Sequence, residues 1–203
     1  MKDPLETRSL PGRIWETVPE SIKDVDQALQ ESFVSIGSRF PEFLKTIKFL
    51  TESPWSIATF LVVLIFFLLK GLRSEAPLRL RLYFLLYSGT WLGLSDLMSS
   101  QLKILFGRLK PHVDFYNPNY LPALSLPSNH SFNSAMLFAL ALGTGKLRSK
   151  GAIIAGFLLC FFIGSSRVFV GQHYPIDIFA GWTFGFLLGL VAARIWRHVL
   201  NER

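Results

Sequence analysis

Three short stretches of this sequence hold residue types that act on phosphate esters: cations, histidines, a small polar cluster and an aspartate. The stretches are 103–111, 127–130 and 166–177, and each borders a long apolar run. Polar and charged residues in such places are functional candidates by default. Their chemically capable residues are Lys103, Arg108, Lys110, Ser128, Asn129, His130, Arg167, His173 and Asp177.

The cations and the polar cluster suit a bound phosphate. Lysine and arginine carry fixed positive charges, and arginine can hold a phosphate through two parallel hydrogen bonds. Ser128 or Asn129 at the start of a helix leaves backbone N–H groups at the positive end of the helix dipole, where anions bind. The predicted phosphate-binding residues are Lys103, Arg108, Lys110, Ser128, Asn129 and Arg167.

His173 and Asp177 have the spacing of a catalytic pair. If Pro175 opens a helix, the two side chains can meet at the mouth of that helix. A carboxylate that accepts a hydrogen bond from Nδ1 leaves the Nε2 lone pair available for in-line attack on phosphorus. His130 then remains to protonate the leaving oxygen. The acidic residues are too scattered to hold Mg²⁺, so the hypothesis is a phosphohistidine route with no metal and no cofactor.

Five apolar runs surround these stretches and predict a membrane protein. The runs are 15 to 21 residues long and contain a single charge, Asp96. About 20 helical residues cross a bilayer core, and flanking lysines and arginines can extend shorter helices. The predicted fold is an all-α polytopic bundle with about five transmembrane spans, or six if the N-terminal region contains another. The runs are 53–69, 82–102, 131–145, 151–166 and 178–193.

The composition agrees with a membrane bundle, since 50% of the 203 residues are hydrophobic and only 17% are charged. Average soluble domains carry about 25% charged residues. The low charged fraction of this chain leaves too little polar surface to cover five apolar helices in water. The expected partners are therefore the lipid bilayer and a phosphate-bearing membrane lipid.

Residues 1–52 differ from the membrane domain, which we assign to 53–203. Apolar residues recur at steps of three and four from Ile22 to Phe40, which is one stripe of an amphipathic helix. Pro41 marks a break before a second amphipathic piece. Charged residues accompany both pieces, so we expect interfacial helices that lie on the membrane surface or pack on the bundle.

The basic residues indicate how the chain is oriented. Five spans place 103–130 and 167–177 on one side of the membrane and the C-terminus on the other. The loops on the C-terminal side hold ten of the 21 basic residues, against four between spans on the opposite side. The positive-inside rule makes the C-terminal side cytoplasmic. The net charge of +7 is then largely a topology signal and not a sign of nucleic-acid binding.

The three stretches resemble the motifs of the type 2 phosphatidic acid phosphatase superfamily, which also includes bacterial acid phosphatases and vanadium haloperoxidases. Its pattern is K-x6-R-P, then P-S-G-H, then S-R-x5-H-x3-D. The sequence keeps this pattern with Lys110 in place of arginine and Asn129 in place of glycine. Lysine loses the two-point grip of arginine, and we expect Arg108 to compensate. Asparagine tolerates positive φ better than most residues, so the backbone contact at position 129 is expected to survive.

The resemblance implies a helical bundle with its site at the membrane–water boundary. It implies that His173 is the nucleophile, Asp177 its orienting partner and His130 the general acid. The implied substrates are phosphatidylglycerol phosphate, phosphatidic acid, a polyprenyl diphosphate or the phosphates of lipid A. The implied ligands of the phosphate oxygens are Lys103, Lys110, Ser128, Arg167 and the backbone at Asn129.

Two other functions are open at this point, namely phosphate transfer from a lipid diphosphate to a second lipid, and transport of lipid phosphates without cleavage. Transport leaves the spacing of His173 and Asp177 unexplained. No signal peptide precedes the first run and the loops are short, which favours a bacterial inner membrane with the site facing the periplasm; an endomembrane is the alternative. Asp96, about two turns before Lys103, either pairs with a motif cation or stays protonated and bonds to a neighbouring helix.

Overall fold

The computed structural model describes residues 13–51, 77–111 and 124–201. Within these ranges the chain is helical and contains no strand, which confirms the all-α prediction there. The predicted run 53–69 lies outside the described residues. The elements are the short 3-10 helix η1 (Ile14–Thr17) and the α-helices α1 (Glu20–Ser38), α2 (Pro41–Thr51), α4 (Leu78–Phe106), α5 (Asn129–Gly143), α6 (Lys150–Phe169) and α7 (Pro175–Asn201).

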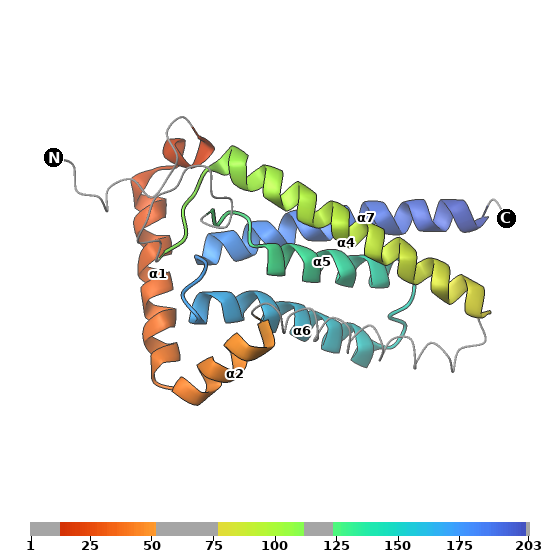
Figure 1. The fold of residues 1–203 in the computed structure, drawn as a ribbon, viewed down its shortest axis with the longest axis horizontal. Coiled ribbons are helices and arrows are strands. Elements are labelled where there is room, and N and C mark those ends of the chain that lie inside the picture. Colours follow the sequence, from red (N-terminus) through yellow and green to blue (C-terminus); the bar gives the residue numbers. More distant parts are fainter. Residues whose placement is uncertain (1–12, 52–76, 112–123, 202–203) are drawn as a thin grey trace.

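Helices α4, α5, α6 and α7 form an elongated bundle, and α1 lies across one end of it (Figure 1). Helices α4 and α6 finish at the end that α1 crosses, whereas α5 and α7 begin there. The N-termini of α5 and α7 therefore meet at the same end of the bundle. The positive ends of two helix dipoles lie together at this place.

Helices α6 and α7 are long and apolar enough to cross a membrane, over residues 150–169 and 175–199. The outward-facing surfaces of these helices carry large apolar side chains that are more than half exposed, such as Phe157 and Leu158 on α6 and Phe179 and Leu187 on α7. An apolar outer surface of this kind suits hydrocarbon better than water. The run 82–102 falls within α4, and the run 131–145 lies in α5 except for its last two residues. The count of five spans stays a prediction.

Helix α7 packs closely on α5 because three glycines, spaced four residues apart, face that helix. A Cβ atom at Gly185 would lie 2.1 Å from the carbonyl oxygen of Phe132, and one at Gly189 would lie 2.3 Å from the carbonyl oxygen of Met136. Small residues let helix backbones approach in membranes, where burial of apolar surface gives no drive for association. At Gly181, the third of these glycines, a Cβ atom would lie 2.8 Å from the carbonyl oxygen of Ser128 at the start of α5.

The amphipathic helix predicted before Pro41 is present as α1, and Pro41 opens α2. The apolar stripe of α1, however, faces outward, and the Val25 side chain is 61% exposed. The polar side chains of Asp26 and Gln30 on α1 are buried, each 2% exposed. In water such a stripe packs inward, whereas a helix beside lipid can turn its apolar side out and reserve its polar side for protein contacts.

Candidate active site

The three sequence stretches come together at the end of the bundle where α5 and α7 begin (Figure 1). Lys103 stands in the last turn of α4, where Gly107 ends the helix in a left-handed conformation, with φ 67°. Arg167 stands in the last turn of α6. Helix ends that alternate in direction along the chain thus place distant residues side by side.

Asp177 in the first turn of α7 is the centre of this site and is fully buried. Its Oδ2 accepts a hydrogen bond from the backbone N–H of Tyr174 at 2.9 Å and lies 3.2 Å from Nδ1 of His173. Its Oδ1 accepts from a terminal nitrogen of Arg108 at 3.0 Å. The backbone N–H of Ser128 donates to the Asp177 carbonyl at 3.0 Å. One residue therefore joins all three motif stretches.

The pairing with Asp177 defines the reactive face of His173. A carboxylate can only accept, so the hydrogen between the two side chains belongs to Nδ1 and the lone pair to Nε2. Burial lowers the pKa of His173 to about 4, and the charges of Lys103 and Lys110 lower it while Asp177 opposes them. The imidazole is neutral at pH 7, which is the form that can attack phosphorus.

Three cations lie around this pair. Lys103 is buried and donates to the carbonyl oxygen of Leu124 at 3.2 Å. Burial lowers the pKa of Lys110, and the charge of Arg167 lowers it further. Arg167 is itself buried and donates to the side-chain oxygen of Gln172. These positions suit the oxygens of a phosphate, as the spacing predicts.

The start of α5 adds polar groups to the site. Ser128 is the N-cap of α5, and its buried hydroxyl has no hydrogen-bond partner among the described residues. His130 follows in the first turn and is half-buried. Asn129 is an ordinary first helical residue, because every positive φ among the described residues belongs to a glycine. The glycine-to-asparagine change therefore requires no left-handed backbone here.

Asp96 on α4 also meets the start of α5. Its Oδ1 accepts a hydrogen bond from the side-chain amide of Asn129 at 2.8 Å. Of the two expectations, the bond to a neighbouring helix is found, but the acid accepts this bond and needs no proton to make it. Asp96 thereby ties α4 to Asn129, within the second motif stretch.

Arg108 is held away from the expected role of a substitute phosphate ligand. One terminal nitrogen donates to Asp177, and the other lies 2.6 Å from Oδ2 of Asp26 on α1. Its guanidinium lies between two aromatic rings, 3.9 Å from the ring centre of Trp15 and 3.6 Å from that of Tyr174. With both terminal nitrogens on carboxylates, this arginine supports the aspartate and does not replace a phosphate ligand.

Sequence reasoning missed Asp26 and Trp15 as parts of the site. A weak signal was available, because Asp26 lies on the polar side of the α1 stripe. An acid on that side is normally read as solvent-exposed. Only the packing of α1 across the bundle shows that this side is buried.

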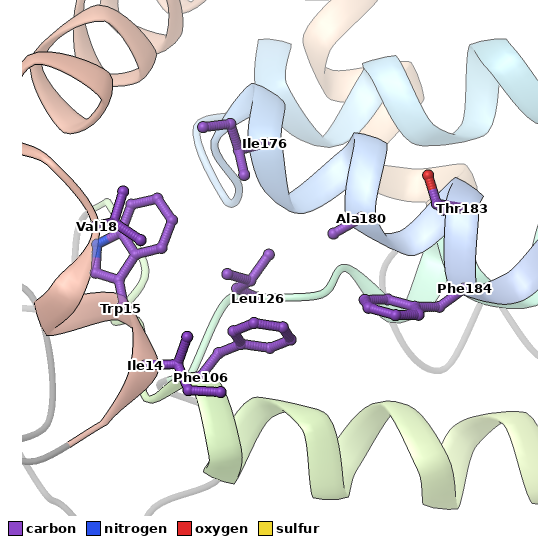
Figure 2. A pocket seen from close by; sticks show the side chains of 9 residues that line it. All are labelled: Ile14, Trp15, Val18, Phe106, Leu126, Ile176, Ala180, Thr183 and Phe184. Carbon is purple, nitrogen blue, oxygen red and sulfur yellow. The ribbon is translucent and has the colours of Figure 1, made fainter.

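An apolar cavity of about 310 Å³ lies beside the site, between η1, the end of α4 and the first turns of α7 (Figure 2). Trp15 forms one wall of the cavity and also stacks on Arg108. Ile176, the neighbour of Asp177, lines it as well. Its lining residues are Ile14, Trp15, Val18, Phe106, Leu126, Ile176, Ala180, Thr183 and Phe184.

Comparison with known families agrees with this geometry. The model of the PAP2 superfamily matches residues 84–200, which is more than half of the chain. The chain belongs to the PAP2 superfamily. This confirms the resemblance drawn from the three motifs, and the match includes all three.

Relatives within the PAP2 superfamily are membrane lipid phosphatases. Lipid A 1-phosphatase of Rhizobium etli is 31% identical over 160 residues, which cover 71% of this chain and 66% of that protein. Undecaprenyl-diphosphatase of Sulfolobus acidocaldarius is 28% identical over 116 residues, covering 51% and 55%. The chain thus spans between about half and two thirds of the length of these two proteins.

The fold is also that of a solved PAP2 protein. The crystal structure of a transmembrane PAP2-type phosphatidylglycerolphosphate phosphatase from Bacillus subtilis matches with a TM-score of 0.66. The match covers 89% of each chain at 23% identity. At this identity the match shows the fold and does not identify the substrate.

Proposed function

We propose that this chain is an integral-membrane lipid phosphatase that hydrolyses a phosphomonoester or diphosphate through a phosphohistidine on His173. The observation that carries the proposal is the pair of Nδ1 of His173 and Oδ2 of Asp177 at 3.2 Å, buried among cations. Phosphatase relatives in the PAP2 superfamily support the reaction type.

The first chemical step forms a bond from Nε2 of His173 to phosphorus and breaks the bond from phosphorus to the lipid oxygen. His130 gives its proton to that oxygen, and the lipid alcohol leaves, or a lipid monophosphate leaves if the substrate is a diphosphate. Asp177 stabilises the positive charge that develops on the imidazole, as a carboxylate does in other histidine-based sites.

The second step returns the enzyme to its starting state. A water molecule attacks phosphorus and gives a proton to His130, and the N–P electron pair returns to Nε2 of His173. Lys103, Lys110 and Arg167, with the N–H groups at the start of α5, bind the negative oxygens throughout. These groups supply the charge that a metal ion would otherwise provide, so activity is expected to persist in a chelator such as EDTA.

The substrate is proposed to be a lipid whose tails stay in the bilayer while its phosphate reaches the end of the bundle. The apolar cavity between η1 and α7 suits one part of a tail (Figure 2). Because three curated relatives are named lipid A 1-phosphatase, that lipid is the first arm of a substrate panel. Phosphatidylglycerol phosphate, phosphatidic acid and a polyprenyl diphosphate are the other arms.

The proposed location is a bacterial inner membrane, with the site facing the periplasm and the C-terminus in the cytoplasm. Basic residues at the opposite end of the described bundle, such as Arg81, Arg148 and Arg197, support this orientation through the positive-inside rule. The division into an interfacial region, 1–52, and a membrane domain, 53–203, belongs to the same proposal.

The test is release of inorganic phosphate from the lipid panel in detergent, with His173→Ala and His130→Ala beside the wild type. Phosphate-ester hydrolysis has one of the highest uncatalysed barriers, so loss of either group should reduce the rate by several orders of magnitude. His198→Ala, at the far end of α7, is the matched control and should retain wild-type activity. Undiminished release by His173→Ala would remove the proposed nucleophile.

The same experiment separates the two alternative functions. A phosphotransferase would yield a newly phosphorylated lipid when an acceptor lipid is present, and little free phosphate. A transporter would bind the lipid and release nothing. Brief exposure to ³²P-labelled lipid, followed by alkaline quench, should trap label on His173 if the phosphohistidine route is right.

A further inference from the structure

Helix α1 reaches the catalytic pair through two consecutive buried ion pairs. Oδ2 of Asp26 lies 2.6 Å from one terminal nitrogen of Arg108, and the other terminal nitrogen donates to Asp177 at 3.0 Å. None of the three side chains is more than 3% exposed. The contact joins residues 26, 108 and 177, which belong to three separate parts of the chain.

The surroundings leave Arg108 little freedom. The rings of Trp15 and Tyr174 lie on either side of its guanidinium, within 3.9 Å, and restrict it to one plane. Asp26 and Asp177 then take its two terminal nitrogens, which sets its rotation within that plane. A planar guanidinium held in this way presents its donors at fixed positions.

Asp26 has a second contact that points to the same place. Its Oδ1 accepts the backbone N–H of Ile176 at 2.9 Å. Ile176 is the second residue of α7, where a backbone N–H has no partner within its own helix. A residue 150 positions away therefore caps the helix that carries Asp177.

We infer that Asp26 is a positioning residue of the active site, which orients Arg108 and through it the Asp177 carboxylate that holds His173. This inference rests on the proposed function. It makes the N-terminal region, from Trp15 through α1, part of the catalytic apparatus in addition to any contact with the membrane surface. The inward polar side of α1 then positions Arg108, whereas its outward apolar stripe contacts the membrane surface.

The test compares Asp26→Asn with Asp24→Asn, which removes the same charge from an exposed position on the same helix. Asp26→Asn should lower kcat by about 10- to 100-fold, by analogy with the losses seen when the hydrogen-bonded partners of metal-ligating residues are removed. KM should stay within about twofold, because Asp26 does not touch the phosphate ligands. Asp24→Asn should keep wild-type kcat and KM.

A double variant separates positioning from simple docking of α1. If Asp26 acts through Arg108, then adding Asp26→Asn to Arg108→Lys should cause no further loss of kcat. Equal losses in the two backgrounds would show that Asp26 acts elsewhere and would overturn the inference. A kcat of Asp26→Asn within twofold of the wild type, or an effect confined to KM, would overturn it as well.

Removing one partner of a buried ion pair can strongly destabilise a protein, because the other charge is left buried and unpaired. Asp26→Glu therefore accompanies the series, because it keeps the charge and the fold while displacing the guanidinium. It should lower kcat at least tenfold with a thermal midpoint close to that of the wild type, and full activity would count against the inference. Failure of the proposed function would look different, since the wild type itself would then release no phosphate.

Discussion

Substituting Gly185 with alanine tests whether the contact between α5 and α7 positions the site. The added Cβ would lie 2.1 Å from the carbonyl oxygen of Phe132 and 2.8 Å from its carbonyl carbon. Carbon and oxygen approach to about 3.3 Å in ordinary C–H···O contacts. The two helices must therefore separate by about 1 Å, because the obstacle is backbone and cannot rotate away.

The separation should affect both stability and rate. Overpacking of this kind costs about 1–3 kcal/mol, which lowers a thermal midpoint by several degrees in a chain of this size. The same shift stretches the hydrogen bond from the Ser128 N–H to the Asp177 carbonyl, now 3.0 Å. A displacement of about 1 Å at a catalytic centre can cost about 100-fold in rate.

The assay measures the thermal midpoint in detergent and the steady-state rate with the best lipid of the panel. Gly89→Ala is the matched control, since a Cβ at that position on α4 meets nothing within 4 Å. It should be neutral, or more stable by about 0.5–1 kcal/mol. If Gly185→Ala is as stable and as active as Gly89→Ala, the close packing of α5 on α7 does not set the site geometry.

Three further predictions concern pH, lipid length and topology. Since burial holds the pKa of His173 at about 4 against 6.5 when it is exposed, the unfolded chain binds the extra proton between these values. The free energy of unfolding should therefore fall by on the order of 3 kcal/mol as the pH drops from 6.5 to 4. In His173→Ala, the thermal midpoint measured across this pH range should fall less steeply than in the wild type. Ala180→Trp, which fills the apolar cavity, should raise KM for long-chain lipid phosphates at least tenfold and leave p-nitrophenyl phosphate hydrolysis unchanged. In a Cys160→Ala background, a membrane-impermeant thiol reagent applied to intact cells should label Asp24→Cys and spare Arg148→Cys; the reverse pattern would invert the proposed orientation.

The convergence of the three motifs could be predicted from hydropathy because alternate helix ends of a bundle share a side. The stretches around Lys103, His130 and His173 each border an apolar run, and counting the runs places all three at one end. The pairing of His173 with Asp177 followed from their four-residue spacing and from Pro175 at the helix start. Both depend on local geometry and on chain direction, which the sequence encodes directly.

The partners of Arg108 could not be predicted, because they depend on how α1 lies across the bundle. The sequence showed a stripe of apolar residues and an arginine two positions before the motif lysine, and it favoured a phosphate contact for that arginine. Which side of the helix faces protein depends on its surroundings. In water the apolar side packs inward, whereas beside lipid the apolar side can face outward and the polar side can contact protein. The left-handed conformation considered for Asn129 failed for a related reason, since residue 129 opens a helix and adopts the backbone of one.

The charges at the site also bear on which form of phosphate the enzyme holds. Lys103, Arg108, Lys110 and Arg167 face two carboxylates, Asp26 and Asp177, and all six side chains are buried or half-buried. With His173 neutral, and with the proton that His130 carries as general acid offset by the carboxylate of Asp96 beside Asn129, the site has a net charge of +2, the opposite of a phosphomonoester dianion. Buried charges are tolerated where they are paired. A phosphate dianion neutralises the positive charge of the site, whereas a singly charged diester leaves one positive charge unpaired. Asp26 contributes to that balance by pairing with Arg108, whose guanidinium is held between Asp26 and Asp177 and is not a phosphate ligand.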